Sequence, residues 1–407
     1  MSVAEKNRTV KIGVVGLGGR GRGLIGTLAQ MDDVVISAVC DIVDECIDEA
    51  IGRIREYKDY PVKRFNNYHD LLAEKDIEGV VIATSWNEHI EIAIASMEAG
   101  KYAAFEVGGA NSIEECWDLV KTYEKTKVPC MMLENCCYGQ YELAILNMIR
   151  HGLFGEIIHC AGGYHHDLRT LADALARNKQ RSFHHLHRNA ELYPTHEIGP
   201  ISKYLNINRG NRFLTLTSTA SKSRGLGIRA EEVFGKDNPY TQNYALGDIV
   251  TTVIKCAGGE TITLTHDTSL PRPYSRGNAV HGTKGIWMEI NKSVYFEDLS
   301  PNPHEWEPIE NYLDKYNHPI WKEFLEDGVT GGHGGMDYLV LRAFIESIQN
   351  ETITPIDVYE SASWMAITCL SEQSISMGSM PVAFPDFTNG KWLTQRPVLE
   401  GKYSLDK

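Results

Sequence analysis

The sequence predicts an α/β protein in two parts, and three observations support this. The first third alternates short apolar runs with helix-length amphipathic segments, a pattern typical of a doubly wound parallel sheet covered on both faces. A glycine-rich turn follows the first apolar run. After about residue 150 the apolar runs follow one another with few helices between them. This second pattern predicts a C-terminal α+β domain with a large, mostly antiparallel, open sheet.

The first part contains five apolar runs that we predict to be buried strands, at residues 11–15, 34–39, 79–83, 102–105 and 130–133. Helices are predicted between them, at 20–30, 44–56, 88–99 and 112–125. Ser112 and Glu115 form a capping-box pattern, which marks the start of the last of these helices.

The second part is predicted to contain strands at residues 155–164, 215–220, 248–256, 261–266 and 285–290. The pair Gly258-Gly259 lies between two of these runs and indicates a hairpin. Residues 336–350 and 357–377 return to a helical pattern. We predict a first domain at 1–136 and a second at 137–407, joined by a connection near 134–138.

Length and charge restrict the function. The 407 residues fit two domains, and the net charge of −14 disfavours a nucleic-acid partner or an anionic membrane surface. No apolar run reaches the ~18–20 residues of a membrane helix. The first eight residues have no apolar signal-peptide core, which predicts a cytoplasmic location. A removed export signal would leave the same picture.

The turn after the first strand carries the pattern Gly-x-Gly-x-x-Gly and opens the first helix. In this context Gly16 permits a tight turn, Gly18 lets the backbone approach a pyrophosphate, and Gly21 permits close helix packing. The N-terminus of the following helix offers N–H donors to phosphates. The motif therefore predicts a Rossmann domain that binds a dinucleotide.

The residue at the end of the second predicted strand indicates which dinucleotide is bound. Asp41 lies 20 residues after Gly21, where a carboxylate hydrogen-bonds the adenosine ribose. Its charge would repel a 2′-phosphate, so NAD is predicted rather than NADP. Arg20 and Arg22 lie close enough in sequence to weaken that repulsion.

Two further loops follow predicted strands of the same sheet. Residues 84–89 include Trp86 and His89, and Glu106 with Val107 follows the next strand. Loops at these strand ends line the ligand crevice of a doubly wound sheet. We predict cofactor contacts from both loops. A helix-capping turn with a packed aromatic ring is the alternative for residues 84–89.

These segments resemble the Gfo/Idh/MocA oxidoreductase superfamily. Most members continue the glutamate at position 106 with Lys-Pro, whereas this chain has Val107-Gly108. A narrower resemblance, to glycoside hydrolase family 109, covers nearly the whole chain. That family comprises NAD-dependent α-N-acetylgalactosaminidases. The motifs that carry this resemblance are residues 132–135, 162–169, 187–196, 206–213, 266–274 and 333–337. The segment 169–181 looks shorter than in the family.

The family resemblance implies a set of site residues. Together with the glycine motif, the implied cofactor contacts are Gly16, Gly18, Gly19, Arg20, Gly21, Asp41, Trp86, Asn87, Glu88, His89, Glu106, Val107 and Asn135. The implied substrate contacts are Tyr164, Arg181, Tyr193, Pro194, Thr195, His196 and Tyr274. His196 and Tyr193 are the predicted catalytic residues, because an imidazole with an ordinary pKa of about 6.5 suits proton transfer near neutral pH. A structural His196 that caps the next helix is the alternative.

The implied reaction is a redox-assisted elimination on a small glycoside. The sugar is oxidised at C3 by NAD⁺, a base removes the C2 proton, the C1 substituent leaves, water adds, and C3 is reduced again. Two alternatives are a sugar C3-dehydrogenase and a non-catalytic NAD-linked sensor. The missing lysine together with the pair Tyr193–His196 argues against the dehydrogenase, and the intact pair argues against the sensor. Glu134, at a strand end beside the crevice, is expected to orient a tyrosine or contact the nicotinamide side.

The remaining expectations concern metals and partners. A histidine-rich stretch at 165–187 lacks defined zinc spacing and accompanying ligands, so no metal is predicted. The expected partner is a small-molecule glycoside, with neither nucleic acid nor membrane. The open C-terminal sheet predicts a homo-oligomer.

Overall fold

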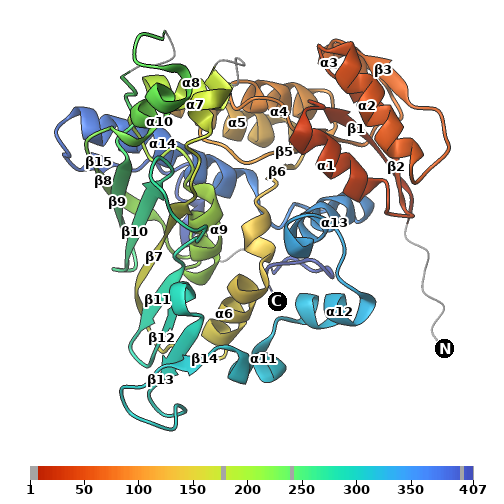
Figure 1. Cartoon of the computed structure of the whole chain (residues 1–407). Coiled ribbons are helices and arrows are strands. Elements are labelled where there is room, and N and C mark those ends of the chain that lie inside the picture. The colour runs from red at the N-terminus through yellow and green to blue at the C-terminus, as the bar shows by residue number, and fades with distance from the viewer. Residues whose placement is uncertain (1–7, 176–179, 239–242, 395–397, 407) are drawn as a thin grey trace, which may run out of the picture.

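The structure is a computed structural model, and it describes residues 8–175, 180–238, 243–394 and 398–406. Figure 1 shows two sheets, one formed near the N-terminus and one from the middle of the chain, with the last long helices lying between and across them. The predicted two-part α/β architecture is confirmed.

The first sheet has six parallel strands in the order β3-β2-β1-β4-β5-β6. Its strands are β1 (Val10–Val15), β2 (Val34–Cys40), β3 (Lys63–Phe65), β4 (Gly79–Ile82), β5 (Tyr102–Phe105) and β6 (Cys130–Met132). The strand order reverses between β1 and β4, and a ligand crevice forms at such a switch point in doubly wound sheets.

The helices of this part follow from amphipathic spacing and capping. In α2, Ile47, Ile51 and Ile54 recur on one face and are buried. The predicted capping box is present, because Ser112 accepts from the Glu115 N–H and the Glu115 side chain accepts in return. The helices are α1 (Gly19–Leu28), α2 (Asp44–Arg55), α3 (Tyr68–Leu72), α4 (His89–Glu98) and α5 (Ile113–Thr126).

The second sheet has nine strands in the order β14-β13-β12-β11-β7-β10-β9-β8-β15. Only the central pair β7/β10 is parallel among the described pairings, so the predicted, mostly antiparallel sheet is confirmed. Gly259, with φ of 106°, makes the hairpin between β9 and β10. The strands are β7 (Ile157–His165), β8 (Phe213–Ala220), β9 (Ile249–Cys256), β10 (Thr261–Asp267), β11 (Ala279–Gly282), β12 (Gly285–Met288), β13 (Ser293–Phe296), β14 (Glu307–Pro308) and β15 (Val382–Ala383).

One face of the second sheet is open. Along β9, Thr251, Val253 and Lys255 are exposed and alternate with buried side chains. The covered face packs against α9 (Thr195–Tyr204) at β7 and α14 (Val358–Ser376) at β8. The other helices are η1 (Asn135–Tyr138), α6 (Gln140–Arg150), α7 (Leu171–Leu175), α8 (Gln180–His187), α10 (Gly225–Phe234), η2 (Glu289–Asn291), α11 (Glu310–Tyr316), α12 (Pro319–Asp327), η3 (His333–Gly335), α13 (Met336–Gln349) and η4 (Lys391–Leu393).

The last two long helices join the two sheets. Helix α13 packs against α1 and β1, where Arg342 makes an ion pair of 2.6 Å with Asp33. Helix α14 contacts α5 and β6 as well as β8. Residues far apart in sequence therefore meet between the sheets. The boundary at 136/137 stays a prediction. In the described part of the chain, no helix is both long and apolar enough to cross a membrane.

Candidate active site

The glycine-rich loop lies tightly between β1 and β4. Gly16 has φ of 88°, and a Cβ there would lie 2.5 Å from the backbone nitrogen of Thr84. A Cβ on Gly21 would collide with the carbonyl oxygen of Gly16. In contrast, a Cβ on Gly18 would meet nothing within 4 Å. The loop is therefore closed toward the sheet and open toward the crevice, as a backbone cradle for phosphates requires.

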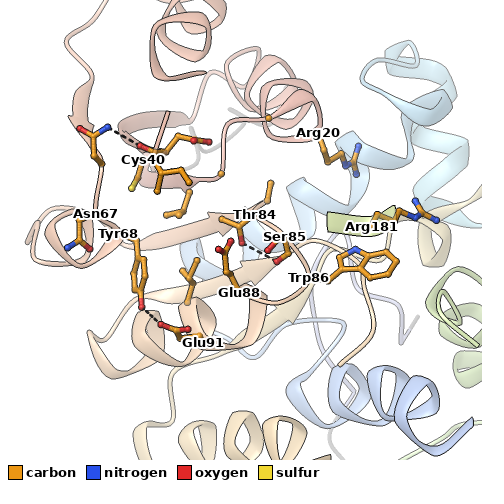
Figure 2. A pocket seen from close by; sticks show the side chains of 18 of the residues that line it. Arg20, Cys40, Asn67, Tyr68, Thr84, Ser85, Trp86, Glu88, Glu91 and Arg181 are labelled. Atoms are coloured by element: carbon orange, nitrogen blue, oxygen red, sulfur yellow. Dashed lines mark hydrogen bonds between the residues drawn. The ribbon is translucent and has the colours of Figure 1, made fainter. Parts of the chain in front are cut away.

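A cavity of about 960 Å³ lies over this loop at the switch point. Figure 2 shows Asn67 and Tyr68 at one end of it and Arg20, Trp86 and Arg181 at the other. The size and the position suit a dinucleotide with its pyrophosphate at the start of α1.

The carboxylate of Asp41 is fixed on the wall of this cavity. Its Oδ2 accepts from the Leu17 N–H at 2.7 Å and its Oδ1 from the Val43 N–H at 3.0 Å. Neither Arg20 nor Arg22 pairs with the Asp41 carboxylate and offsets its charge. Arg20 is bound to Asp337, and Arg22 pairs with Glu49 at 2.8 Å. The residues present fit NAD and disfavour the 2′-phosphate of NADP.

Asp337, at the start of α13, connects the side chains around the other end of the cavity. Its carboxylate accepts two hydrogen bonds from Arg20, at 2.6 and 3.0 Å, and one from Asn135, at 2.7 Å. Arg20 also donates to Glu106 at 2.8 Å. Burial acts to raise the pKa of Asp337, but hydrogen bonds from His333 and Arg20 outweigh it and hold that pKa well below its usual range.

A second cavity, of about 320 Å³, adjoins the first. Arg20, Ala83, Thr84, Trp86 and Arg181 line both. The other residues around it are His89, Glu106, Val107, Asn135, Tyr164, Tyr193, His196 and His333. This volume suits a sugar ring or the reacting end of a cofactor, and side chains from both sheets meet there.

The side chains of His196 and Glu134 form a hydrogen-bonded acid–base pair at this cavity. His196 lies in the first turn of α9, and its Nδ1 is 2.8 Å from Oε1 of Glu134. Glu134 is fully buried, and its Oε1 also accepts from the Cys136 N–H at 3.0 Å. Burial acts to raise the pKa of Glu134, but the charge of His196 and its hydrogen bonds keep that pKa below its usual value. The carboxylate therefore stays ionised and orients the imidazole, which leaves Nε2 for a reacting proton.

Three aromatic rings and one arginine form the wall beside this pair. The guanidinium carbon of Arg181 lies 4.6 Å from the centre of the Tyr193 ring, 5.3 Å from that of Trp86 and 5.4 Å from that of Tyr164. Its Nε and Nη2 are buried and have no hydrogen-bond partner among the described residues. Burial raises the pKa of Tyr193 well above its usual value, so its phenol stays protonated.

Most of the predicted site residues line the two cavities, but six do not. The residues that line neither are Gly19, Gly21, Asn87, Pro194, Thr195 and Tyr274. Tyr274 is half exposed, with its ring centre 6.4 Å from that of Tyr164. His89 lines the second cavity as a neutral side chain, since burial lowers its pKa to about 4.

Sequence reasoning missed other residues that the fold brings to the site. Asp337 and His333 belong to a recognised motif, but nothing in that motif indicates that it meets Arg20. His184 lines the first cavity, with its ring centre 5.1 Å from that of Trp86. Glu134 pairs with His196, whereas a tyrosine or the nicotinamide was expected.

No metal was predicted from the sequence. Among the described residues, one group of three side chains could in principle hold a metal ion. Atoms of Glu134, Cys136 and His196 lie within 4.8 Å of one another. Burial raises the pKa of the Cys136 thiol well above its usual value, so the thiolate that a metal needs is disfavoured. A metal would also replace the hydrogen bond between His196 and Glu134. The chemistry of this donor set favours proton transfer.

The fold and the two cavities define a dinucleotide-dependent enzyme, and the comparison with known families agrees. Residues 10–134 match the family model for an oxidoreductase family with an NAD-binding Rossmann fold. Residues 138–394 match the model for the C-terminal domain of glycosyl hydrolase 109. The chain belongs to glycosyl hydrolase family 109. It is thus an NAD-dependent glycoside hydrolase.

Individual proteins give the same picture. A glycosyl hydrolase family 109 protein of Stenotrophomonas maltophilia is 41% identical, over 98% of this chain and 94% of its own length. An α-N-acetylgalactosaminidase of Tannerella forsythia is 40% identical, over 96% and 88% respectively. Among solved structures, a levoglucosan dehydrogenase in complex with NADH aligns with a TM-score of 0.72 at 19% identity, covering 93% of this chain and all of that one. At that identity the structural match shows the fold alone.

Proposed function

We propose that this enzyme cleaves α-N-acetylgalactosaminides by transient oxidation at C3 and elimination of the C1 substituent. The observation that carries the proposal is the junction of the two cavities, where a cradle for NAD opens directly onto the His196–Glu134 pair. The Tannerella forsythia relative, named for that activity, supports the sugar.

The cofactor, when bound, supplies a hydride acceptor for C3 of the sugar and returns the hydride at the end of the cycle. In our proposal the proton of the C3 hydroxyl passes to Nε2 of His196 as the hydride leaves, and from there to solvent, so the imidazole is free to act again at C2. In our proposal, Nε2 of His196 removes the C2 proton, and Glu134 stabilises the imidazolium that forms. The protonated phenol of Tyr193, whose ring centre is 4.9 Å from that of His196, donates a hydrogen bond to the C3 oxygen. That hydrogen bond stabilises the charge that develops when C2 loses its proton.

The remaining wall residues bind the sugar in this proposal. The unpartnered Nε and Nη2 of Arg181 are donors for a hydroxyl or the acetamido oxygen. The rings of Trp86, Tyr164 and Tyr193 surround this arginine and exclude water. Val107 stands where most superfamily members have lysine and supplies no proton, so proton transfer depends on the His196–Glu134 pair.

A panel of aryl glycosides tests the proposal. The enzyme loaded with NAD⁺ should release the phenol from the α-N-acetylgalactosaminide over many turnovers without accumulation of NADH, and removal of NAD⁺ should abolish release. The phenol and the absorbance of NADH are followed together. One NADH per sugar consumed would instead show a C3-dehydrogenase. The absence of turnover on every glycoside would support a non-catalytic sensor.

Two expectations from the sequence stay predictions. Pairing of two copies through the second sheet is supported by its open face, on which Thr251, Val253 and Lys255 of β9 are exposed. The cytoplasmic location also remains an expectation. No contact with nucleic acid or a membrane enters the proposal.

A further inference from the structure

His333 lines the second cavity beside Arg20, which lines both cavities, and has no role in the mechanism above. It belongs to η3, directly before α13, and lines the second cavity. Its Nδ1 is 2.8 Å from Oδ2 of Asp337 and 3.4 Å from Nη1 of Arg20. More than half of its side chain is exposed, so the ring is held by one edge and otherwise faces open space.

The residues around His333 are predicted contacts of the cofactor or bind such contacts. Asp337 holds Arg20 and Asn135 with the same carboxylate, and Arg20 also binds Glu106. Arg20 lies in the first turn of α1 and lines both cavities, next to the open backbone at Gly18. A pyrophosphate binds at such a helix start, because backbone N–H groups and the helix dipole favour an anion there.

We propose that His333, fixed by Asp337, is a further residue of the NAD site and donates a hydrogen bond to the pyrophosphate. The second half of the chain then closes over a cofactor that the first half cradles. This inference rests on the bound NAD of the proposed function, and a measurement of NAD affinity tests it apart from glycoside cleavage.

The charges around the ring support this assignment. The hydrogen bond to Asp337 raises the pKa of His333 above its usual value, despite opposing influences from burial and Arg20. The charged groups that face it are Asp337 from α13, Arg20 from α1, and Glu106 after β5. At mildly acidic pH the imidazolium adds a positive charge beside Arg20, where the acidic side chains of Asp337 and Glu106 otherwise balance that arginine, and so makes the position of the pyrophosphate more favourable for an anion.

The test measures NAD⁺ and ADP-ribose affinity by calorimetry at pH 6 and pH 9, on the full chain freed of nucleotide. His333→Gln should weaken both ligands about tenfold at pH 6, since a charge-assisted hydrogen bond is lost. At pH 9 a smaller fraction of wild-type His333 is protonated than at pH 6, so the difference in affinity between wild type and His333→Gln should narrow. His304→Gln is the matched control, because His304 is also exposed and has a left-handed backbone, with φ of 66° against 50° for His333.

Three outcomes would overturn the inference. Unchanged affinity of His333→Gln at pH 6 would remove the residue from the site. An equal loss at pH 6 and pH 9 would indicate only a structural role for the loop. A loss confined to NAD⁺, with ADP-ribose bound normally, would place the ring at the nicotinamide. Comparison with His304→Gln at both pH values separates the contribution of His333 from the pH dependence of the rest of the protein.

Discussion

Replacement of His196 by alanine should reduce kcat by about 10²–10⁴-fold, the range typical for loss of a general acid–base group. The affinity for NAD⁺ should stay within about twofold of wild type, because His196 lies in α9 and lines only the second cavity. Steady-state rates on the aryl α-N-acetylgalactosaminide and calorimetric NAD⁺ titration measure the two quantities.

Glu134→Gln is the companion variant to His196→Ala. It keeps a hydrogen-bonding group beside Nδ1 of His196 but removes the buried negative charge that stabilises the imidazolium. We expect a smaller loss of kcat than for His196→Ala, with NAD⁺ binding retained. A loss of less than about tenfold for His196→Ala would move the base elsewhere, first to Tyr193.

Replacement of Gly21 by alanine should abolish measurable NAD⁺ binding and with it turnover. The added Cβ would collide with the carbonyl oxygen of Gly16, so the loop must move away from β1 and the cradle is lost. Overpacking of this kind costs about 1–3 kcal/mol, and the melting temperature should fall. NAD⁺ titration and thermal unfolding measure both effects.

Gly23→Ala, in the same helix, is the matched control for Gly21→Ala. A Cβ on Gly23 meets nothing within 4 Å, and the residue is exposed. Because alanine favours a helix over glycine by about 0.5–1 kcal/mol, this variant should bind NAD⁺ normally and melt slightly higher. Normal NAD⁺ affinity in Gly21→Ala would contradict the packing role of that glycine.

The sequence predicted those parts of the fold that leave a local pattern. The helices and strands that were predicted lie within two or three residues of their observed ends, as for the helix predicted at 112–125 and found at Ile113–Thr126. The amphipathic helix α6 (Gln140–Arg150) and the strand β11 (Ala279–Gly282) were not predicted.

Strand β3 was missed because its three residues, Lys63–Phe65, are mostly exposed and carry no apolar alternation. The strands β13, β14 and β15 were missed because they have only two to four residues, and two residues such as Val382–Ala383 show no periodicity. Strand β15 also pairs with β8, which is far away in the sequence.

In the site, too, the residues with a local sequence pattern were predicted, and the contacts between distant segments were not. The glycine loop and Asp41 are local features with a known spacing, so residues from both came to line the first cavity. The pair His196–Glu134 joins positions 62 residues apart, and Arg20–Asp337 joins positions 317 apart. Such contacts depend on how α9 and α13 pack between the sheets. Single-sequence patterns carry no signal for that packing.

The most direct test of the central claim is the fate of the C2 hydrogen. If His196 removes the C2 proton before the C1 substituent leaves, turnover in D₂O must place deuterium at C2 of the released sugar, because the proton returns from solvent. NMR or mass spectrometry of the product measures this directly. The account predicts one deuterium at C2 and strict dependence on bound NAD⁺. A released sugar that carries hydrogen at C2, formed equally well without NAD⁺, would contradict it.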